Sequence, residues 1–194
     1  MKVEDSSQIV YIYNINDSVG KVRTVLDNYP TFLNMVNVYE FGLINKIREE
    51  RVTNRRISRG ELGVRVQTSN QSNPTSTEGD ERDEISNAVK AGDYITALRG
   101  ADDFDLHRAE ILSLKNMRED YALVCRQFGA VGDDGKLLER YLSHELDLIT
   151  IADSEGVTLE AIKQRFKKAK KKIIKGCVRW IHESEEYFVM EKGA

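Results

Sequence analysis

Residues 148–181 constrain the fold more than any other stretch, because apolar residues recur there at steps of three and four on both sides of Gly156. The first apolar series predicts a short helix over 148–155. Its inner face would be formed by Ile149 and Ala152, with Leu148 and Ile151 beside them. Gly156 can adopt a positive φ, so it can end this helix and reverse the chain.

A second helix is expected to begin directly after the turn. Thr158 is a good N-cap, and Glu160 suits the positive end of the helix dipole. One buried stripe is expected at Leu159, Ile162, Phe166, Ala169 and Ile173. Val157 would fill the gap between the two helices. With a support helix at 136–142, the stretch predicts a helix-turn-helix.

The outer face of the second helix is strongly basic. No Asp or Glu occurs over 161–181, although the chain carries a formal net charge of −3. A charge run on a helix is often only a solvated face, but this local reversal of sign favours contact with nucleic acid.

Two roles are expected within this candidate DNA-binding site. Lys163, Gln164 and Lys167 lie on the first turns, where side chains reach base edges in the major groove. Contact with phosphates is expected from Arg165, Lys168, Lys170, Lys171 and Lys172, followed by Lys175 and Arg179. Thr158 completes the site at the start of the helix.

The stretch resembles the C-terminal region 4 domain of bacterial sigma factors. The matching residues are Ile151-Ala152, Gly156-Val157-Thr158, Ile162-Lys163, Arg165-Phe166 and Ala169-Lys170-Lys171-Lys172-Ile173. The family often has Leu at the position of Glu155, so this chain departs from the pattern inside the turn. The resemblance covers about a quarter of the chain. It implies DNA binding and contact with RNA polymerase.

A second resemblance lies upstream, in residues 63–75. This polar segment is similar to one found in small phage and prophage transcription regulators, among them late-transcription activators and autolysin-regulator-like proteins. Those proteins carry a sigma-like helix-turn-helix behind a helical N-terminal part. The resemblance implies a regulator encoded by a phage or prophage.

The rest of the chain predicts an all-α fold, because it has only two prolines and mostly helical apolar spacing. We expect helices over 19–28 and from Pro30 to Ile47, short helices from Glu84 that break at Gly92, and a helix of about 25 residues from Asp103. Residues 129–135 read as a turn. The β-branched and aromatic residues of 8–15 predict a strand or an extended arm.

These elements suggest two helical parts. Residues 1–60 would form an N-terminal helical domain, and 61–83 a polar linker or loop. Residues 84–194 would form a helical domain that ends in the helix-turn-helix at about 136–175.

Two further segments leave alternatives open. The basic segment 46–59 can be a solvated helix end, a second DNA backbone contact or a contact with a partner protein. The tail 180–190 places Tyr187, Phe188 and Val189 among acidic residues, so it can fold back or dock on a partner.

The sequence does not predict an enzyme, a metal site or a cofactor. His107, His144 and His182 are scattered, as is typical of surface or lightly packed residues. No phosphate-binding loop, dinucleotide fingerprint or catalytic triad occurs. Cys125 and Cys177 make no ligand pattern and fit small buried residues in a reducing cytoplasm. No apolar run reaches the roughly 20 residues that a membrane span needs.

The expected function is therefore a sequence-specific transcription regulator that binds double-stranded DNA. A homodimer would add affinity, since one helix-turn-helix rarely suffices. The alternatives are a protein-interaction adaptor or anti-regulator without DNA binding, and a phage DNA-packaging subunit. A salt-dependent DNA titration separates the first two, and assembly into a large ring would favour the third.

Overall fold

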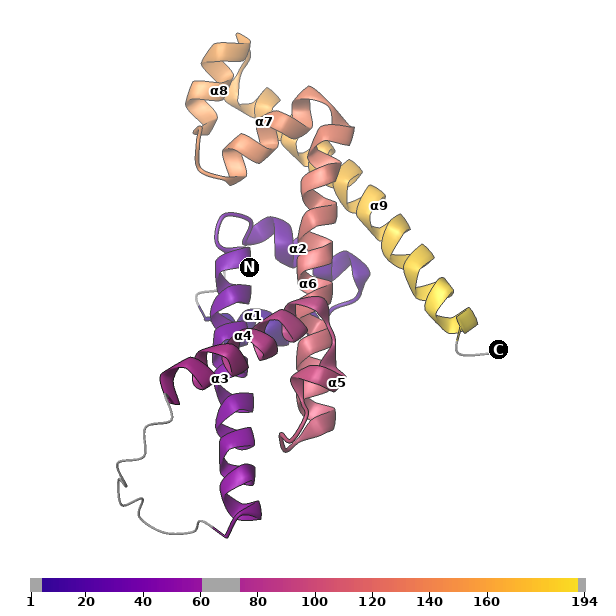
Figure 1. Ribbon diagram of the computed structural model, residues 1–194. Coiled ribbons are helices and arrows are strands. Elements are labelled where there is room, and N and C mark those ends of the chain that lie inside the picture. Colours follow the sequence, from indigo (N-terminus) through magenta and orange to yellow (C-terminus); the bar gives the residue numbers. More distant parts are fainter. Residues whose placement is uncertain (1–4, 61–73, 192–194) are drawn as a thin grey trace. The chain divides into compact units, whose positions relative to one another are not determined.

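The computed structural model describes residues 5–60 and 74–191, with side chains for 5–60 and 79–181. Every regular element in this part of the chain is an α-helix, which confirms the all-α prediction for it (Figure 1). The helices are α1 (Ser6–Ile15), α2 (Ser18–Asp27), α3 (Phe32–Ser58), α4 (Pro74–Ala91), α5 (Tyr94–Ala97), α6 (Phe104–Val131), α7 (Asp133–Leu142), α8 (Leu148–Glu155) and α9 (Leu159–Glu191). None of these described helices has the length and apolarity required to cross a bilayer.

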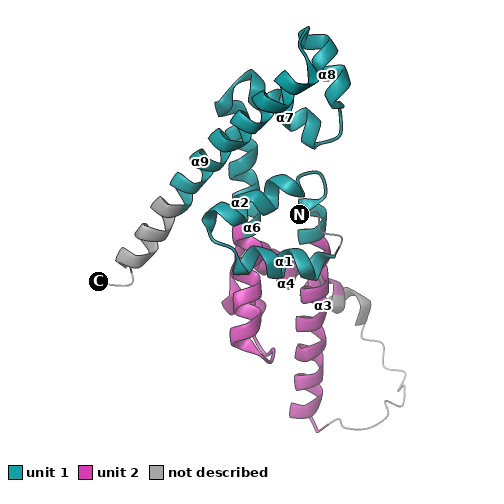
Figure 2. Ribbon diagram, turned by 180° about the vertical axis from the view of Figure 1, so that it is seen from behind, with its two compact units in different colours: residues 1–36, 117–194 teal, residues 37–116 magenta. Residues whose placement is uncertain are grey.

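The chain divides into two compact units (Figure 2). Unit 1 comprises residues 1–36 and 117–194, and unit 2 comprises 37–116. This division differs from the expected separation of 1–60 from 84–194. In addition, α4 begins at Pro74, inside the expected linker. A proline is well tolerated in the first turn of a helix.

The expected linker and the phage-like segment are therefore described only in part. Residues 61–73 lie outside the described residues, and 74–83 are helical. Polar composition alone suggested a loop, but the apolar positions Ile85, Ala88 and Val89 are buried and hold this helix in unit 2.

The N-terminal segment of unit 1 is helix α1, so the expectation of a strand or an extended arm is wrong. The Asp5 carboxylate caps the helix by accepting a hydrogen bond from the Ser7 amide at 3.0 Å. Ile9 and Tyr13 are four residues apart and fully buried. Their packing outweighs the intrinsic preference of β-branched and aromatic residues for strands.

An aromatic cluster gives unit 1 much of its core. The ring of Tyr121 on α6 stacks on Tyr29 at 5.4 Å and on Phe32 at 5.9 Å between centroids. Tyr29 also meets Phe128 edge-on at 5.2 Å. Its hydroxyl donates to the Glu139 carboxylate at 3.0 Å, which ties α7 to this cluster.

The connection between α6 and α7 is shorter than the turn expected at 129–135. Helix α6 continues to Val131, and α7 starts at Asp133. Gly135 on α7 is buried, and a Cβ atom there would clash with the Phe128 carbonyl oxygen. The glycine therefore allows the close approach of the two helices, which a sequence pattern does not reveal.

In unit 2, Arg51 on α3 supports the short helix α5. Its guanidinium donates to the carbonyl oxygens of Thr96 at 2.6 Å and Ala97 at 2.9 Å. These are carbonyls that the end of a helix leaves without intrahelical partners. Before α5, Gly92 has a φ of 74° and interrupts the chain as expected.

Candidate nucleic-acid interface

Helix α8, the turn at Gly156 and the start of α9 lie in unit 1. Each occurs at the residues expected from the sequence. Helix α8 spans Leu148–Glu155, and Gly156 has φ 63° and ψ 33°. The Val157 amide donates to the Ala152 carbonyl at 3.1 Å, which closes the end of the helix. Thr158 caps α9, because its hydroxyl oxygen accepts from the Ala161 amide at 3.2 Å.

A cap on α8 was not foreseen from the sequence. The Asp147 carboxylate accepts a hydrogen bond from the Thr150 amide at 2.7 Å. This bond lowers the pKa of Asp147 below its usual range. The signal was present as an Asp before an apolar run.

The buried stripe of α9 is confirmed for four of its five expected residues: Ile162, Phe166, Ala169 and Ile173. Leu159 is 41% exposed and does not belong to it. Val157 is also exposed, so it does not fill the gap between the helices.

The inner face of α8 is shifted from the expected one. Ile151 and Ala152 are buried, whereas Ile149 is 60% exposed. Over a helix of only two turns, apolar spacing leaves the rotation of the helix poorly specified. The packing of α8 against α9 selects the face.

Most of the expected DNA-binding side chains are exposed on α9, namely Lys163, Gln164, Lys167, Lys168, Lys171 and Lys172, with Lys170 half-buried. They lie on two sides of the helix. Helical spacing places Lys163, Lys167 and Lys170 on one side, and Gln164, Lys168 and Lys171 further around it. Gln164 also donates to the Glu160 carboxylate at 3.1 Å.

Arg165 does not join this exposed set, because carboxylates of two other helices hold its guanidinium. Its guanidinium bonds to Asp134 on α7 at 2.6 and 2.7 Å and to Glu155 on α8 at 2.9 Å. Hydrogen bonds to Glu155 and Asp134 raise the pKa of Arg165 above its usual value. Arg165 therefore joins α7, α8 and α9.

This arrangement also gives Glu155 a role. The sigma-factor pattern often has an apolar residue there, whereas here the carboxylate lies 2.9 Å from the Arg165 guanidinium. This ion pair joins the last residue of α8 to α9.

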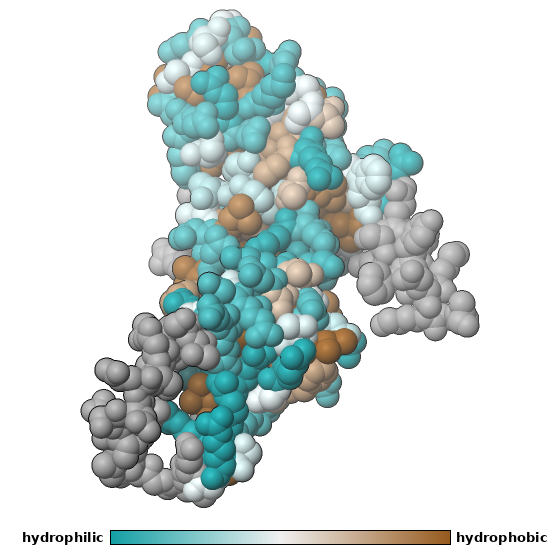
Figure 3. All heavy atoms as spheres, in the orientation of Figure 1, coloured by the Kyte–Doolittle hydropathy of each residue, from teal (hydrophilic) through white to brown (hydrophobic). Residues whose placement is uncertain are grey.

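An apolar groove with a lysine rim lies beside the exposed lysines. It has a volume of about 350 Å³ and is lined by Leu138, Tyr141, Leu148, Phe166 and Ile174 and by Lys163, Lys167, Lys170 and Lys171. The rings of Tyr141 and Phe166 are 5.4 Å apart at its floor. Hydrophobic surface is visible between hydrophilic side chains over α7 and α8 (Figure 3). The groove could not be predicted from the sequence, because its residues come from three helices.

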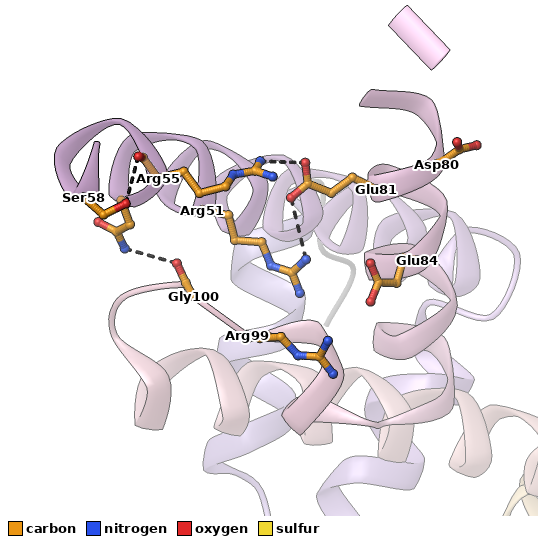
Figure 4. A pocket seen from close by; sticks show the side chains of 9 residues that line it. Arg51, Arg55, Ser58, Asp80, Glu81, Glu84, Arg99 and Gly100 are labelled. Atoms are coloured by element: carbon orange, nitrogen blue, oxygen red, sulfur yellow. Dashed lines mark hydrogen bonds and ion pairs between the residues drawn. The ribbon is translucent and has the colours of Figure 1, made fainter. Parts of the chain in front are cut away.

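Unit 2 contains a larger pocket, of about 620 Å³, lined by polar side chains of α3, α4 and the segment after α5 (Figure 4). Its arginines are Arg51, Arg55 and Arg99, and its acidic residues are Asp80, Glu81 and Glu84. Arg55 bonds to Glu81 at 2.7 Å, with Arg51 at 3.8 Å from the same side chain. Because the charges balance, the pocket offers no net attraction for an anion.

These contacts bear on the three alternatives for segment 46–59. Arg51 is buried, and Arg55 is paired within unit 2. Two of its arginines therefore stabilise the unit, which differs from a freely solvated helix end. Arg56 and Arg59 remain exposed.

His107 differs most from the expectation of a surface or lightly packed residue. It is fully buried rather than a surface residue. Its Nδ1 lies 2.7 Å from the Glu110 carboxylate and its Nε2 lies 3.1 Å from the Glu50 carboxylate. Burial opposes protonation, but the hydrogen bonds and charges of Glu110 and Glu50 outweigh it and raise the pKa of His107. Both ring nitrogens are engaged, so the residue supports packing within unit 2.

The cysteines are both free thiols, and Cys177 is buried. Burial raises the pKa of the Cys177 thiol to about 12. In the described part of the chain, no group of His, Cys, Asp and Glu side chains converges in a way that could hold a metal ion. Comparison with protein-family models, curated proteins and solved structures found no match to the chain.

Proposed function

We propose that the protein is a sequence-specific transcription regulator that binds duplex DNA through the exposed face of α9. One observation carries this proposal. Directly after the Gly156 turn, α9 exposes lysines along an acid-free stretch of a chain that is acidic overall. Clustered cations on one helix provide the electrostatic contact that nucleic-acid binding requires.

Within the proposed interface, Lys163, Gln164 and Lys167 would reach base edges from the first turns of α9. Lys168, Lys171 and Lys172 would contact phosphates. Arg165 has no direct part, since Asp134 and Glu155 hold it. The resemblance to sigma region 4 and to phage regulators supports a role in phage or prophage transcription, including contact with RNA polymerase.

A titration of duplex DNA at several salt concentrations tests the proposal. The logarithm of the affinity should fall against the logarithm of salt by about 0.9 per phosphate neutralised. The double variant Lys168→Gln/Lys171→Gln should flatten this slope. Lys90→Gln, at an exposed lysine on α4, is the matched control and should leave it unchanged. Absence of binding at low salt would reject DNA binding.

Sequencing of bound fragments tests specificity separately. Gln164→Ala should relax the preferred sequence, because a bidentate base contact contributes about 1–3 kcal/mol of discrimination. Lys171→Ala should weaken all sequences alike. The opposite pattern would mean that a different side of α9 faces the bases.

The groove supports a second candidate, a protein-interaction module without DNA binding. Its apolar floor and basic rim suit an acidic amphipathic helix. Failure of the DNA titration would leave this candidate in place.

A further inference from the structure

We infer that the lysine-rimmed groove binds the acidic C-terminal segment of a second copy of this chain, so that two α9 helices pair antiparallel in a two-fold dimer. The pairing would cover Lys163 and Lys167. It would therefore compete with the proposed DNA binding, and this regulatory consequence rests on the proposed function.

The first argument is the charge distribution along α9, which runs from Leu159 to Glu191. Residues 161–181 contain no acid, whereas Glu183, Glu185, Glu186 and Glu191 follow within the same helix. An antiparallel pair places the basic half of each helix beside the acidic half of the other. Such complementarity favours this orientation over a parallel one, which would bring like charges together.

The second argument is the spacing of the residues. The groove side of α9 carries Lys163, Lys167, Lys170 and Ile174. Steps of four and three continue from there along the sequence to Val178, Ile181, Glu185 and Phe188, of which Ile181 is already buried within the single chain. Alternating steps of three and four form the contact seam of paired helices. Ile174 and Val178 are half-buried in the single chain, so they retain apolar surface for a partner.

An antiparallel register follows from this spacing. When Ile174 lies opposite Val178 of the second copy, Lys167 lies opposite Glu185 of the second copy. Lys163, at the groove end, then lies opposite Phe188 and Val189 of the second copy. This register pairs the aromatic and aliphatic positions of the segment with the groove end, and its acidic positions with the lysine rim.

The helical geometry of α9 argues against docking within one chain. Residues 163 and 188 are 25 positions apart on one continuous helix, about 37 Å at 1.5 Å per residue. The segment reaches the groove of its own chain only if α9 breaks. A second copy needs no such break, and two-fold symmetry forms the contact twice.

Sedimentation equilibrium of the full chain tests the dimer. The wild type should self-associate, and Lys167→Glu or Glu185→Lys should each weaken association by at least about tenfold through like-charge contacts. A mixture of these two variants should restore the dimer, because both contacts of the heterodimer then pair opposite charges. Lys90→Glu is the control and should behave as the wild type.

Three results would overturn the inference: a wild-type monomer at all concentrations, a dimer that neither charge reversal weakens, and single variants that fail to associate when mixed. Thermal melting checks that each variant is folded. If a charge-reversal variant does not melt as the wild type does, Lys167→Gln or Glu185→Gln replaces it. These variants should also weaken association.

The competition with DNA has its own readout. Phe188→Ala should weaken the dimer without changing the net charge, and should raise the apparent DNA affinity at protein concentrations where the wild type is dimeric. If the wild type dimerises but no form binds DNA, only the proposed function fails. If a monomeric wild type binds DNA, only the dimer fails. Unchanged DNA affinity in a dimer-deficient Phe188→Ala variant would overturn the competition.

Discussion

At the scale of single residues, two charged side chains have roles that are set by distant partners. Arg165 lies in the basic run of α9, yet it bonds to carboxylates on α7 and α8. His107 is enclosed between carboxylates of α3 and α6. Both residues therefore contribute to stability rather than to a free charged surface.

Replacing Arg165 should loosen the attachment of α7 and α8 to α9. For Arg165→Ala we expect a loss of about 1 kcal/mol in the free energy of unfolding, because the ion pairs are partly exposed but form a network. Urea denaturation would measure it, with Lys168→Ala as the matched control on the same helix. If Arg165→Ala kept wild-type stability and reduced the salt slope of DNA binding, the arginine would be a phosphate contact after all.

The stability of unit 2 should depend on pH through His107. The pKa of this residue is raised above its ordinary value of 6.5, so folding favours the protonated ring. Its contribution is complete below the unfolded pKa and is lost as the pH rises through the folded pKa. The free energy of unfolding of the wild type should thus decrease above pH 6.5.

His107→Gln provides the comparison for this pH dependence, since Gln keeps a polar group but does not titrate. Urea denaturation from pH 6 to pH 9 should show a smaller difference between wild type and variant at the alkaline end. A difference that stays constant or grows with pH would show that the ring is neutral in the folded protein.

At the scale of elements, the connection between α8 and α9 depends on backbone conformation rather than on space. Gly156 has a left-handed φ of 63°, and a Cβ atom there would meet no other atom within 4 Å. Backbone strain is therefore the only penalty for a side chain at this position.

Gly156→Val should destabilise this connection more than Gly156→Asn, because Asn tolerates the left-handed region and a β-branched residue does not. We expect a cost of about 1–2 kcal/mol for the valine variant. Thermal melting and DNA titration of both variants would test this. Equal effects of Val and Asn would imply that the side chain clashes with a neighbour.

At the scale of the whole molecule, the chain forms two units, and one of them combines two segments that are far apart in the sequence. Residues 1–36 belong with 117–194, and α2 contacts α9 directly. A disturbance of the C-terminal helices should therefore affect the N-terminus.

Ala152→Leu tests this organisation, because Ala152 is buried in α8 and added methylenes cost about 1–3 kcal/mol by overpacking. Hydrogen exchange should increase in α1 and α2 as well as in α8 and α9. The segments of unit 2 should change less. Faster exchange confined to α8 and α9 would instead favour an independent C-terminal domain, as the sequence suggested.

The sequence by itself determined the helical class, the limits of α8, the Gly156 turn and most of the buried stripe of α9. These features depend on local spacing, caps and backbone freedom, which neighbouring residues encode. The exposure of most lysines of α9 was also predictable, whereas Leu159, Arg165 and Lys170 differ from expectation. Their binding to DNA stays a prediction.

Only the tertiary structure decided the features that depend on contacts between distant residues. It made residues 6–15 a helix, buried His107, paired Arg165 with Asp134 and Glu155, and formed the lysine-rimmed groove from three helices. The physical reason is that burial and ion pairing are set by neighbours in space. Residues differ in their intrinsic helix and strand propensities, which can be read directly from a sequence. These differences are smaller than the free energy that such packing contributes.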